Sequence, residues 1–397
     1  MATRSFLLLL LYTSPACVTR AVLSVVVGVL GFRGAGIWGA TASLIVMGAL
    51  PGLIGVFGGL LSDMVGNEKY LLMALRAALF LTISAMAFAA GDLFLLFLLF
   101  AAVQLFFAFA SPAASAYIRE VLGDYALILR FNALFSVTCT GLSAAADVAS
   151  SLLLQAGAAA ASLLLFSAAL MPLSAIPLAF IGTRGRPRSG ASPANIFGSM
   201  WAQLRSNRAL AFLFSVYLTT GAFSMPSLLL WIYNFYGSLE LSWGISLALI
   251  QIGGAIGGII AAKAGAGDFF RLALALPASA IVAGAMPLVT RDVWGLIVVL
   301  ASVFVEQIIV QAFFVSADSY ITAFSRREVV ATAMAGFTAV QSAVNIAGMA
   351  AWSAVASYVY PPFVMVGGMS AEVAVLALLI KVFKPPRPAS GQQADVR

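Results

Sequence analysis

Polar residues that could take part in chemistry interrupt several long apolar stretches of this chain. A charged side chain in such a stretch costs at least about 2–3 kcal/mol if the stretch crosses a membrane, so it is a candidate functional residue. A guanidinium group can bind an anion, and a carboxyl group removed from water can bind and release a proton near neutral pH. The candidates of this kind are Arg20, Gln104, Asp147, Glu306, Gln307, Gln311 and Glu372.

Arg20 and Glu306 are the first candidates to consider, because each lies near the middle of its apolar stretch. We expect Arg20 either to bind an anionic substrate group or to neutralise Glu306, and we expect Glu306 to carry a proton. A permanent structural pair of Arg20 with Glu306, or with Asp147, is the alternative.

Other kinds of chemistry have no motif in this sequence. There is no His, and both Cys17 and Cys139 lie in apolar stretches, so we expect neither a metal site nor a disulfide. The glycine motifs that bind phosphates or dinucleotides are absent, as are nucleophile motifs. We therefore expect no enzyme and no cofactor. The net charge is +7, but the basic residues lie between apolar stretches, so we expect no nucleic-acid partner.

The composition indicates an all-α membrane protein. The chain has 397 residues, of which 62% are hydrophobic and 9% charged, whereas a soluble domain has roughly 25% charged residues. Apolar stretches of about 20 residues recur, and such stretches span a bilayer as helices. We predict twelve transmembrane helices, at residues 6–30, 37–61, 70–90, 93–117, 126–153, 158–181, 209–236, 241–262, 269–289, 293–317, 329–355 and 361–383.

One long connection divides the predicted helices into six and six. Residues 182–208 are basic and contain a segment with the pattern of an amphipathic surface helix. We predict a six-helix bundle at 1–181, a cytoplasmic linker at 182–208, a second bundle at 209–384 and a disordered cytoplasmic tail at 385–397. The N-terminus also resembles a signal peptide, but we favour a first membrane helix because the apolar stretch continues to Leu30.

Lys and Arg residues are distributed unevenly between the connections. If both termini are cytoplasmic, only Arg33 and Arg291 lie in outer connections and Arg20 lies within a helix. The other basic residues, Arg76 included, then lie on the inner side. The positive-inside rule favours this orientation. We therefore predict a multi-pass plasma-membrane protein with both termini in the cytoplasm.

The two halves of the chain repeat each other. The segment Gly58–Lys69 aligns without gaps with Gly257–Asp268, and the segment Ser115–Ile118 is similar to Asp318–Ile321. Two parallel halves of this kind are an arrangement found in transporters. The first segment also carries Gly59, Asp63, Gly66 and Lys69, the pattern of the signature that the major facilitator superfamily has between its second and third helices, although Met64 and Glu68 replace two basic residues of that signature.

The resemblance to the major facilitator superfamily implies a central cavity lined by helices 1, 4, 7 and 10, and alternating access by rocking of the two halves. It also implies that the signature Asp helps to lock one state against the start of helix 11. We therefore expect Asp63 to pair with Arg326 or Arg327, which precede helix 11. In the second half, we expect Lys263 to face Glu120 or Asp124.

The function predicted on these grounds is secondary active transport of a small organic solute, coupled to protons. Many Phe residues and few amides on the expected cavity helices favour efflux of an amphipathic metabolite or drug. An importer of an organic anion bound by Arg20 is one alternative, and a non-transporting membrane receptor or scaffold is another. The expected partners are the solute, protons and the lipid bilayer, and the expected state is a monomer.

Overall fold

The structure is a computed structural model, and it describes residues 2–55, 57, 67–122, 125–182, 202, 205–223, 239–264, 269–285, 292–324 and 330–383. Within these ranges the chain forms helices and no strand. Nine of the described helices are long and apolar enough to cross a membrane, and two apolar helices, Arg208–Ala222 and Arg271–Val282, are shorter. The fold class is therefore all-α, as predicted, but the described residues do not confirm the count of twelve.

The helices follow the predicted order along the chain. Their bounds are α1 Ala2–Leu44, the π-helix η1 Ile45–Ala49, α3 Glu68–Phe88, α4 Leu93–Leu122, α5 Tyr125–Gln155, α6 Ala160–Ala179, α8 Arg208–Ala222, α10 Leu239–Ala264, α11 Phe269–Ala273, α12 Leu276–Ala285, α13 Val293–Phe324, α14 Val330–Tyr358 and α15 Pro361–Phe383.

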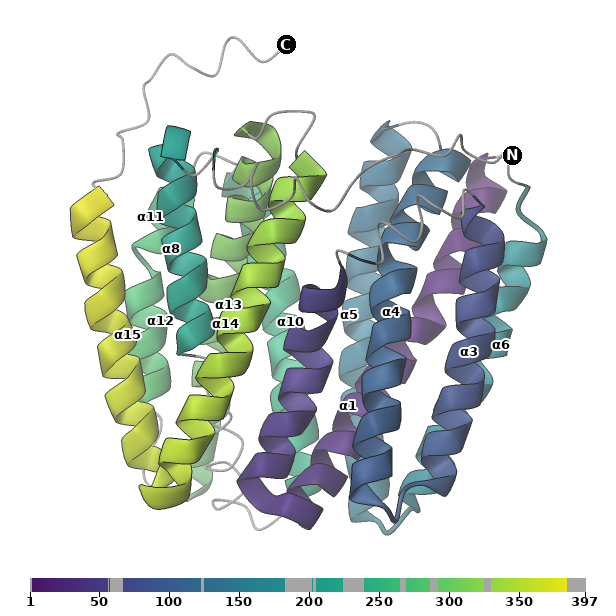
Figure 1. The fold of residues 1–397 in the computed structure, drawn as a ribbon, viewed down its shortest axis with the longest axis horizontal. Coiled ribbons are helices and arrows are strands. Elements are labelled where there is room, and N and C mark those ends of the chain that lie inside the picture. The colour runs from purple at the N-terminus through teal and green to yellow at the C-terminus, as the bar shows by residue number, and fades with distance from the viewer. Residues whose placement is uncertain are drawn as a thin grey trace.

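The first two predicted helices form one continuous apolar run, Arg4–Gly55, in place of two separate helices. The chain nevertheless reverses direction inside α1, as Figure 1 shows. The reversal falls at Ala35 and Gly36, whose backbone angles are not helical. Gly36 has a φ of 57°, in the left-handed region that a residue without a Cβ adopts at little cost. The predicted connection between residues 30 and 37 is therefore a two-residue break.

The predicted helix at 269–289 is broken into α11 and α12. Proline has no backbone N–H to donate and its ring clashes with the preceding turn, so it can break a helix, whereas it fits well in the first turn. Pro277 is the second residue of α12, and the break lies directly before it. The predicted helix at 209–236 is described only to Ala222 as α8, because residues 224–238 lie outside the described ranges.

The described helices form two groups that lie side by side (Figure 1). α1 and α3 to α6 make up the first half, and α8 and α10 to α15 make up the second half. α1 begins and α15 ends at the same end of the bundle, which we call the termini end, and the opposite end is the distal end (Figure 1). The linker at 183–201 and the tail at 384–397 lie outside the described ranges.

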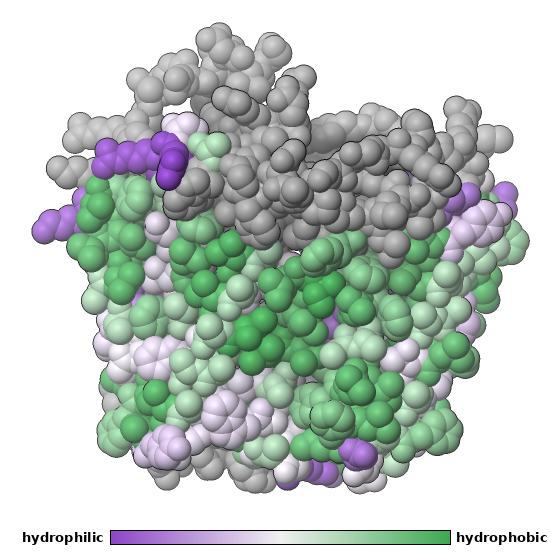
Figure 2. All heavy atoms as spheres, in the orientation of Figure 1, coloured by the Kyte–Doolittle hydropathy of each residue, from purple (hydrophilic) through white to green (hydrophobic). Residues whose placement is uncertain are grey.

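The coloured part of the face shown in Figure 2 is mainly apolar between the two ends of the bundle. Leu81, Leu173 and Leu378 are each more than half exposed, although each is a large apolar residue. A soluble protein rarely exposes so many apolar residues together, whereas a bilayer accepts them. The protein is therefore a multi-pass membrane protein.

The two halves meet through α10, which packs on α5 and α1, and through α14, which packs on η1 and α1. Arg33 forms an ion pair with Glu240, and the hydroxyl groups of Thr41 and Ser353 are hydrogen-bonded. The indole of Trp243 lies against Gly28 of α1. Since Arg33 and Thr41 flank the reversal in α1, these contacts close the interface at the distal end.

α10 is held to α13 of its own half by two glycines. A Cβ at Gly253 would lie 2.9 Å from the Phe304 carbonyl oxygen, and a Cβ at Gly257 would lie 2.6 Å from the Ile308 carbonyl oxygen. Small residues four positions apart allow this close approach. Gly258, in contrast, has no neighbour within 4 Å of the position that a Cβ would take. The close approach therefore uses one face of α10 and joins two helices of the same half.

Candidate functional site

A cavity of about 620 Å³ lies mainly within the first half, and we call it the first cavity. Residues of α1, η1, α3, α4 and α5 line it, and α10 of the second half closes one side. The polar residues that line it are Tyr12, Thr13, Arg20, Ser24, Arg76, Gln104, Ser111, Ser143, Asp147 and Gln251. Arg20, Gln104 and Asp147 were predicted to be site residues, and the structure brings these three together.

Arg20 extends from α1 into the first cavity, where its side chain is accessible. Its guanidinium carbon lies 4.4 Å from the ring centroid of Phe107 on α4. A guanidinium over an aromatic face is attracted by the electrons of the ring and is held in orientation. The Arg20 side chain is therefore positioned by Phe107, with no acidic partner among the described residues.

Arg76 is a second guanidinium in the first cavity, and the sequence analysis missed it. We had counted Arg76 with the inner connections, but it lies in the third turn of α3 and is only 4% exposed. Its guanidinium carbon lies 4.7 Å from the ring centroid of Tyr12, and its Nη1 donates to the Met171 sulfur at 3.6 Å. The Nε atom has no hydrogen-bond partner in the described part of the chain. The position of Arg76 inside a predicted helix was the signal available for finding it.

Asp147 is the acidic residue of the first cavity. It lies on α5, is 1% exposed, and neither carboxylate oxygen has a hydrogen-bond partner among the described residues. The ion pair between Arg33 and Glu240 is the only one that the described ranges contain. The permanent pairing of Arg20 with Asp147 or Glu306 that the sequence left open is therefore not formed in this structure. Two guanidinium groups and one carboxyl group share the cavity without direct pairing.

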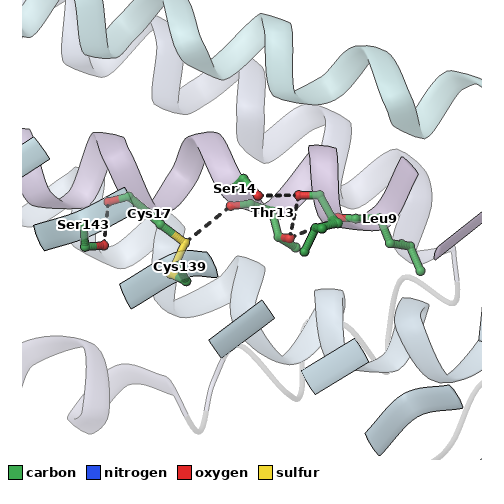
Figure 3. Close-up of a disulfide and its surroundings, with 7 residues drawn as sticks. Leu9, Thr13, Ser14, Cys17, Cys139 and Ser143 are labelled. Carbon is green, nitrogen blue, oxygen red and sulfur yellow. Dashed lines mark hydrogen bonds between the residues drawn. A yellow bond between two sulfur atoms is a disulfide. The ribbon is translucent and has the colours of Figure 1, made fainter. Parts of the chain in front are cut away.

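A disulfide between Cys17 and Cys139 joins α1 to α5 at the wall of the first cavity (Figure 3). The expectation that these residues form no disulfide was wrong. The two Cα atoms are 5.4 Å apart although 122 residues separate them in the chain. The Ser143 hydroxyl donates to the Cys17 carbonyl oxygen at 3.3 Å, one turn beyond Cys139. Pairing depends on how α1 packs on α5, and the sequence pattern of either helix does not contain this information.

A second cavity, of about 390 Å³, lies within the second half. We call it the second cavity. Glu306 and Gln307 of α13 line it together with Glu372 of α15. Its other polar lining residues are Thr220, Ser246, Ser279, Gln341 and Asn345. The structure therefore brings Glu306 and Glu372 together but separates both from Arg20.

The two cavities are lined by adjacent faces of α10. Ser246 and Ile250 line the second cavity, whereas Leu247 and Gln251 line the first. The predicted site residue Gln311 lines neither cavity, and its side chain lies beside Gly254 and Gly257 of α10.

Most of the residues predicted to form the gate fall outside the described part of the chain. Lys69, which is described, donates from Nζ to the carbonyl oxygens of Ala179 and Ile181, at 3.3 and 2.8 Å. It therefore binds the end of α6 within its own half. Lys263 is exposed near the end of α10, and Glu120 lies in α4 with its side chain outside the description. Gly59, Asp63, Gly66, Asp124, Arg326 and Arg327 lie outside the described ranges.

Comparison with known proteins finds similarity in structure only. No protein-family model matches the chain, and no curated protein matches it. A crystal structure of the nucleoside transporter NupG is similar with a TM-score of 0.70 and 15% identity, covering 96% of this chain and 99% of that chain. A POT family transporter in complex with 5-aminolevulinic acid is similar with a TM-score of 0.71 and 13% identity, covering 96% of each chain.

A third similar structure is a mutant of the peptide transporter POT in complex with alafosfalin, with a TM-score of 0.68 and 15% identity, covering 95% of this chain and 93% of that chain. At these identities the similarity is one of fold. The three proteins are transporters, and their fold is the one that the repeat and the signature between the second and third predicted helices had indicated. The chain therefore has the fold of the major facilitator superfamily of transporters, as its sequence predicted.

Proposed function

We propose that this protein is a secondary active transporter that moves a small organic anion by alternating access. The observation that carries this proposal is the presence of Arg20 and Arg76 in one cavity without an acidic partner among the described residues. The solved structures of similar fold are named as nucleoside and peptide transporters, so polar organic solutes are moved by proteins with this fold.

The chemistry of the two arginines favours an anion over the amphipathic drug that the sequence favoured. Guanidinium groups present several N–H donors in a plane and bind carboxylate or phosphate oxygens with charge-assisted hydrogen bonds. Arg76 is buried at the cavity wall, and its Nε has no hydrogen-bond partner among the described residues. If Asp147 is ionised, the cavity still carries a net positive charge. An anionic solute would compensate that charge, whereas a cation would add to it.

We place the coupling proton on Asp147, although the sequence had favoured Glu306 for this role. Asp147 shares its cavity with the proposed anion-binding arginines, and its oxygens are buried and have no hydrogen-bond partner in the part of the chain that the structure describes. The other ionisable side chains that line this cavity are Arg20, Arg76 and Tyr12. A proton on Asp147 increases the positive charge that faces the solute, so proton binding and anion binding support each other.

We also propose that the whole chain spans the membrane twelve times, with both termini in the cytoplasm. Arg4–Gly55 supplies two spans, and α8 and the α11–α12 pair each form part of one, which gives twelve spans in two bundles of six. Both termini are cytoplasmic in a plasma membrane, by the distribution of Lys and Arg. The closed distal end then faces outward, so the conformation is inward-facing. The gate formed by Asp63 with Arg326 or Arg327, and by Lys263 with Glu120 or Asp124, closes the opposite side in the other state, and the protein works as a monomer.

The decisive experiment measures flux in proteoliposomes across a panel of carboxylates, sulfonates and phosphate monoesters, with imposed pH gradients of either sign. We expect anion flux that Arg20→Ala and Arg76→Ala each reduce by roughly 10- to 100-fold, which corresponds to the loss of a charged hydrogen bond of about 1.5–3 kcal/mol. Because transport by a secondary carrier follows the imposed gradients, both directions are tested.

Arg20→Lys and Arg76→Lys are the matched controls, since each keeps the charge and loses the planar donor set. We expect intermediate flux from both. Anion flux that is unchanged in Arg20→Ala and in Arg76→Ala, in protein that still elutes as one species, would contradict the proposal.

A further inference from the structure

The second cavity carries the opposite charge to the first. Glu306 and Glu372 line it, and no Lys or Arg is among its described lining residues. The carboxyl groups come from α13 and α15, two helices that are separated in sequence by α14. Acidic residues alone do not define a binding site, so the remainder of the wall decides what this cavity can hold.

Two further polar groups of the wall have no partner in the described part of the chain. Ser246 of α10 is completely buried, and its hydroxyl forms no hydrogen bond. The side-chain oxygen of Asn345 on α14 is buried and unpartnered as well. A buried polar group without a partner is costly, and its presence beside a cavity indicates that a ligand or water completes it. Both groups can accept a hydrogen bond, as an ammonium group requires.

The apolar part of the wall also suits a cation. Phe223 and Phe314 present aromatic rings to the second cavity, and Met349, Met365 and Met369 present thioethers. Aromatic faces attract cations, and thioethers are polarisable and adapt to irregular shapes. Carboxylates, neutral acceptors and aromatic rings are thus gathered in one cavity.

The second cavity lies next to the first along α10. Neighbouring residues of α10 line the two cavities, Ser246 the second and Leu247 the first. Leu44, the last residue of α1, lines the second cavity, and Met47 of η1 lines the first. α10 packs on α5 of the other half, so rocking of the two halves displaces the helix that lines both cavities.

We propose that the transported solute carries a positive group as well as its anionic group, and that the second cavity binds the positive group. The inference rests on the proposed function, because it assigns the anionic group of the same solute to Arg20 and Arg76. It names the substrate class as small organic zwitterions.

The test compares proteoliposome uptake of three probes with the same six-carbon chain. Hexanesulfonate carries only a negative charge, hexyltrimethylammonium carries only a positive charge, and 6-aminohexanesulfonate carries both. The proteins are the wild type, Glu306→Gln, Glu372→Gln, and the double variant, with Glu306→Asp as the control that keeps the charge. We expect the wild type to take up the zwitterion with a kcat/KM at least about 10-fold above that of hexanesulfonate, as the gain of one charged contact predicts.

The double variant should lower kcat/KM for 6-aminohexanesulfonate by about 10-fold or more and leave that for hexanesulfonate within about 2-fold, because only the zwitterion has a positive group to place against the carboxyl groups. Glu306→Asp should retain most of the preference. A wild type without preference for the zwitterion overturns the inference, as does an equal loss for both sulfonates, which would assign the carboxyl groups to coupling or stability. Loss of uptake of both probes when Na⁺ is replaced by N-methylglucamine would assign the cavity to an inorganic cation and also overturns it.

Failure of the proposed function gives a different result. In that case Arg20→Ala leaves uptake of both sulfonates unchanged, or uptake of hexyltrimethylammonium exceeds that of either sulfonate and depends on Glu306. The variants in the second cavity therefore test binding of the positive group, whereas those in the first cavity test transport of the anion.

Discussion

The first and second cavities occupy corresponding halves of a repeated structure, but they carry opposite charges. Helix α4 of the first half corresponds to α13 of the second, and the alignment of Ser115–Ile118 with Asp318–Ile321 also pairs Gln104 with Gln307. Each of these glutamines lines the cavity of its own half. Around them, the first cavity has Arg20 and Arg76, whereas the second has Glu306 and Glu372. The repeat therefore preserves the scaffold and a neutral polar position, while the charged residues differ between the halves.

Under the zwitterion proposal, this difference gives the two halves different tasks in binding one solute. A carrier with two equal cavities could bind a symmetric solute, or the same group in two places. Opposite charges in the two cavities would instead orient a solute that has two unlike ends.

The repeated glutamines allow the same substitution to be made in both cavities. Gln104→Glu adds a negative charge to the wall that holds Arg20. We expect it to reduce anion uptake by roughly 10- to 100-fold, because repulsion between this charge and the anion would cost about 1.4–2.7 kcal/mol. Gln307→Glu should leave hexanesulfonate uptake almost unchanged, because it adds the charge to the second cavity. Equal effects of the two substitutions would show that the cavities do not differ in the way that we propose.

Asp147 is the one acidic residue of the basic cavity, and its removal separates coupling from binding. We expect Asp147→Asn to abolish accumulation driven by a pH gradient while exchange of labelled for unlabelled anion continues, because exchange does not require net proton movement. The measurement is uphill uptake and counterflow in the same proteoliposomes. Asp147→Glu keeps a carboxyl group and is the control. Uphill uptake that persists in Asp147→Asn would show that Asp147 does not carry the coupling proton.

The two faces of α10 should respond differently to a bulky residue. A Cβ at Gly257 would meet the Ile308 carbonyl oxygen and the Ala312 amide nitrogen, whereas a Cβ at Gly258 would meet nothing within 4 Å. We expect Gly257→Val to destabilise the protein by about 1–3 kcal/mol relative to Gly258→Val, by overpacking against α13. Both substitutions introduce the same β-branched residue into the same helix, so propensity cancels. Thermal unfolding followed by tryptophan fluorescence measures the difference, and equal transition temperatures would contradict the packing.

The contact between Arg33 and Glu240 should have the smallest effect. The Arg33 side chain is 57% exposed and that of Glu240 is 10% exposed, so water screens the pair and its contribution is about 0.2–1 kcal/mol. We expect Glu240→Gln to shift the population toward a distal-open state by roughly 1.5- to 5-fold. Spin labels at the distal ends of α1 and α10 measure this shift, and the exchanged pair Arg33→Glu with Glu240→Arg should reverse it. A shift that the exchange does not reverse would have another cause.

Much of this fold follows from local properties of the sequence. Each helix needs about 20 apolar residues, and that pattern, together with the repeat and the signature residues Gly59, Asp63, Gly66 and Lys69, was sufficient to predict the superfamily fold. The starts of α4 and α13 are also local, since Asp92 and Asp292 accept hydrogen bonds from the backbone N–H groups of Leu95 and Gly295. Pro277 could have indicated the break in the predicted helix at 269–289, but the continuous apolar pattern favoured a single helix.

The sequence was sufficient to identify a membrane protein with charges inside its helices, because an apolar run and an ionisable residue within it can be read one helix at a time. Which of those charges share a cavity depends on the packing of the helices. The sequence left open whether Arg20 meets a solute, Glu306 or Asp147, and the structure places it in a cavity with Arg76 and Asp147, while Cys17 reaches Cys139. These relations depend on the rotation and contact of helices that are far apart in the chain, and no local pattern in any one helix specifies them.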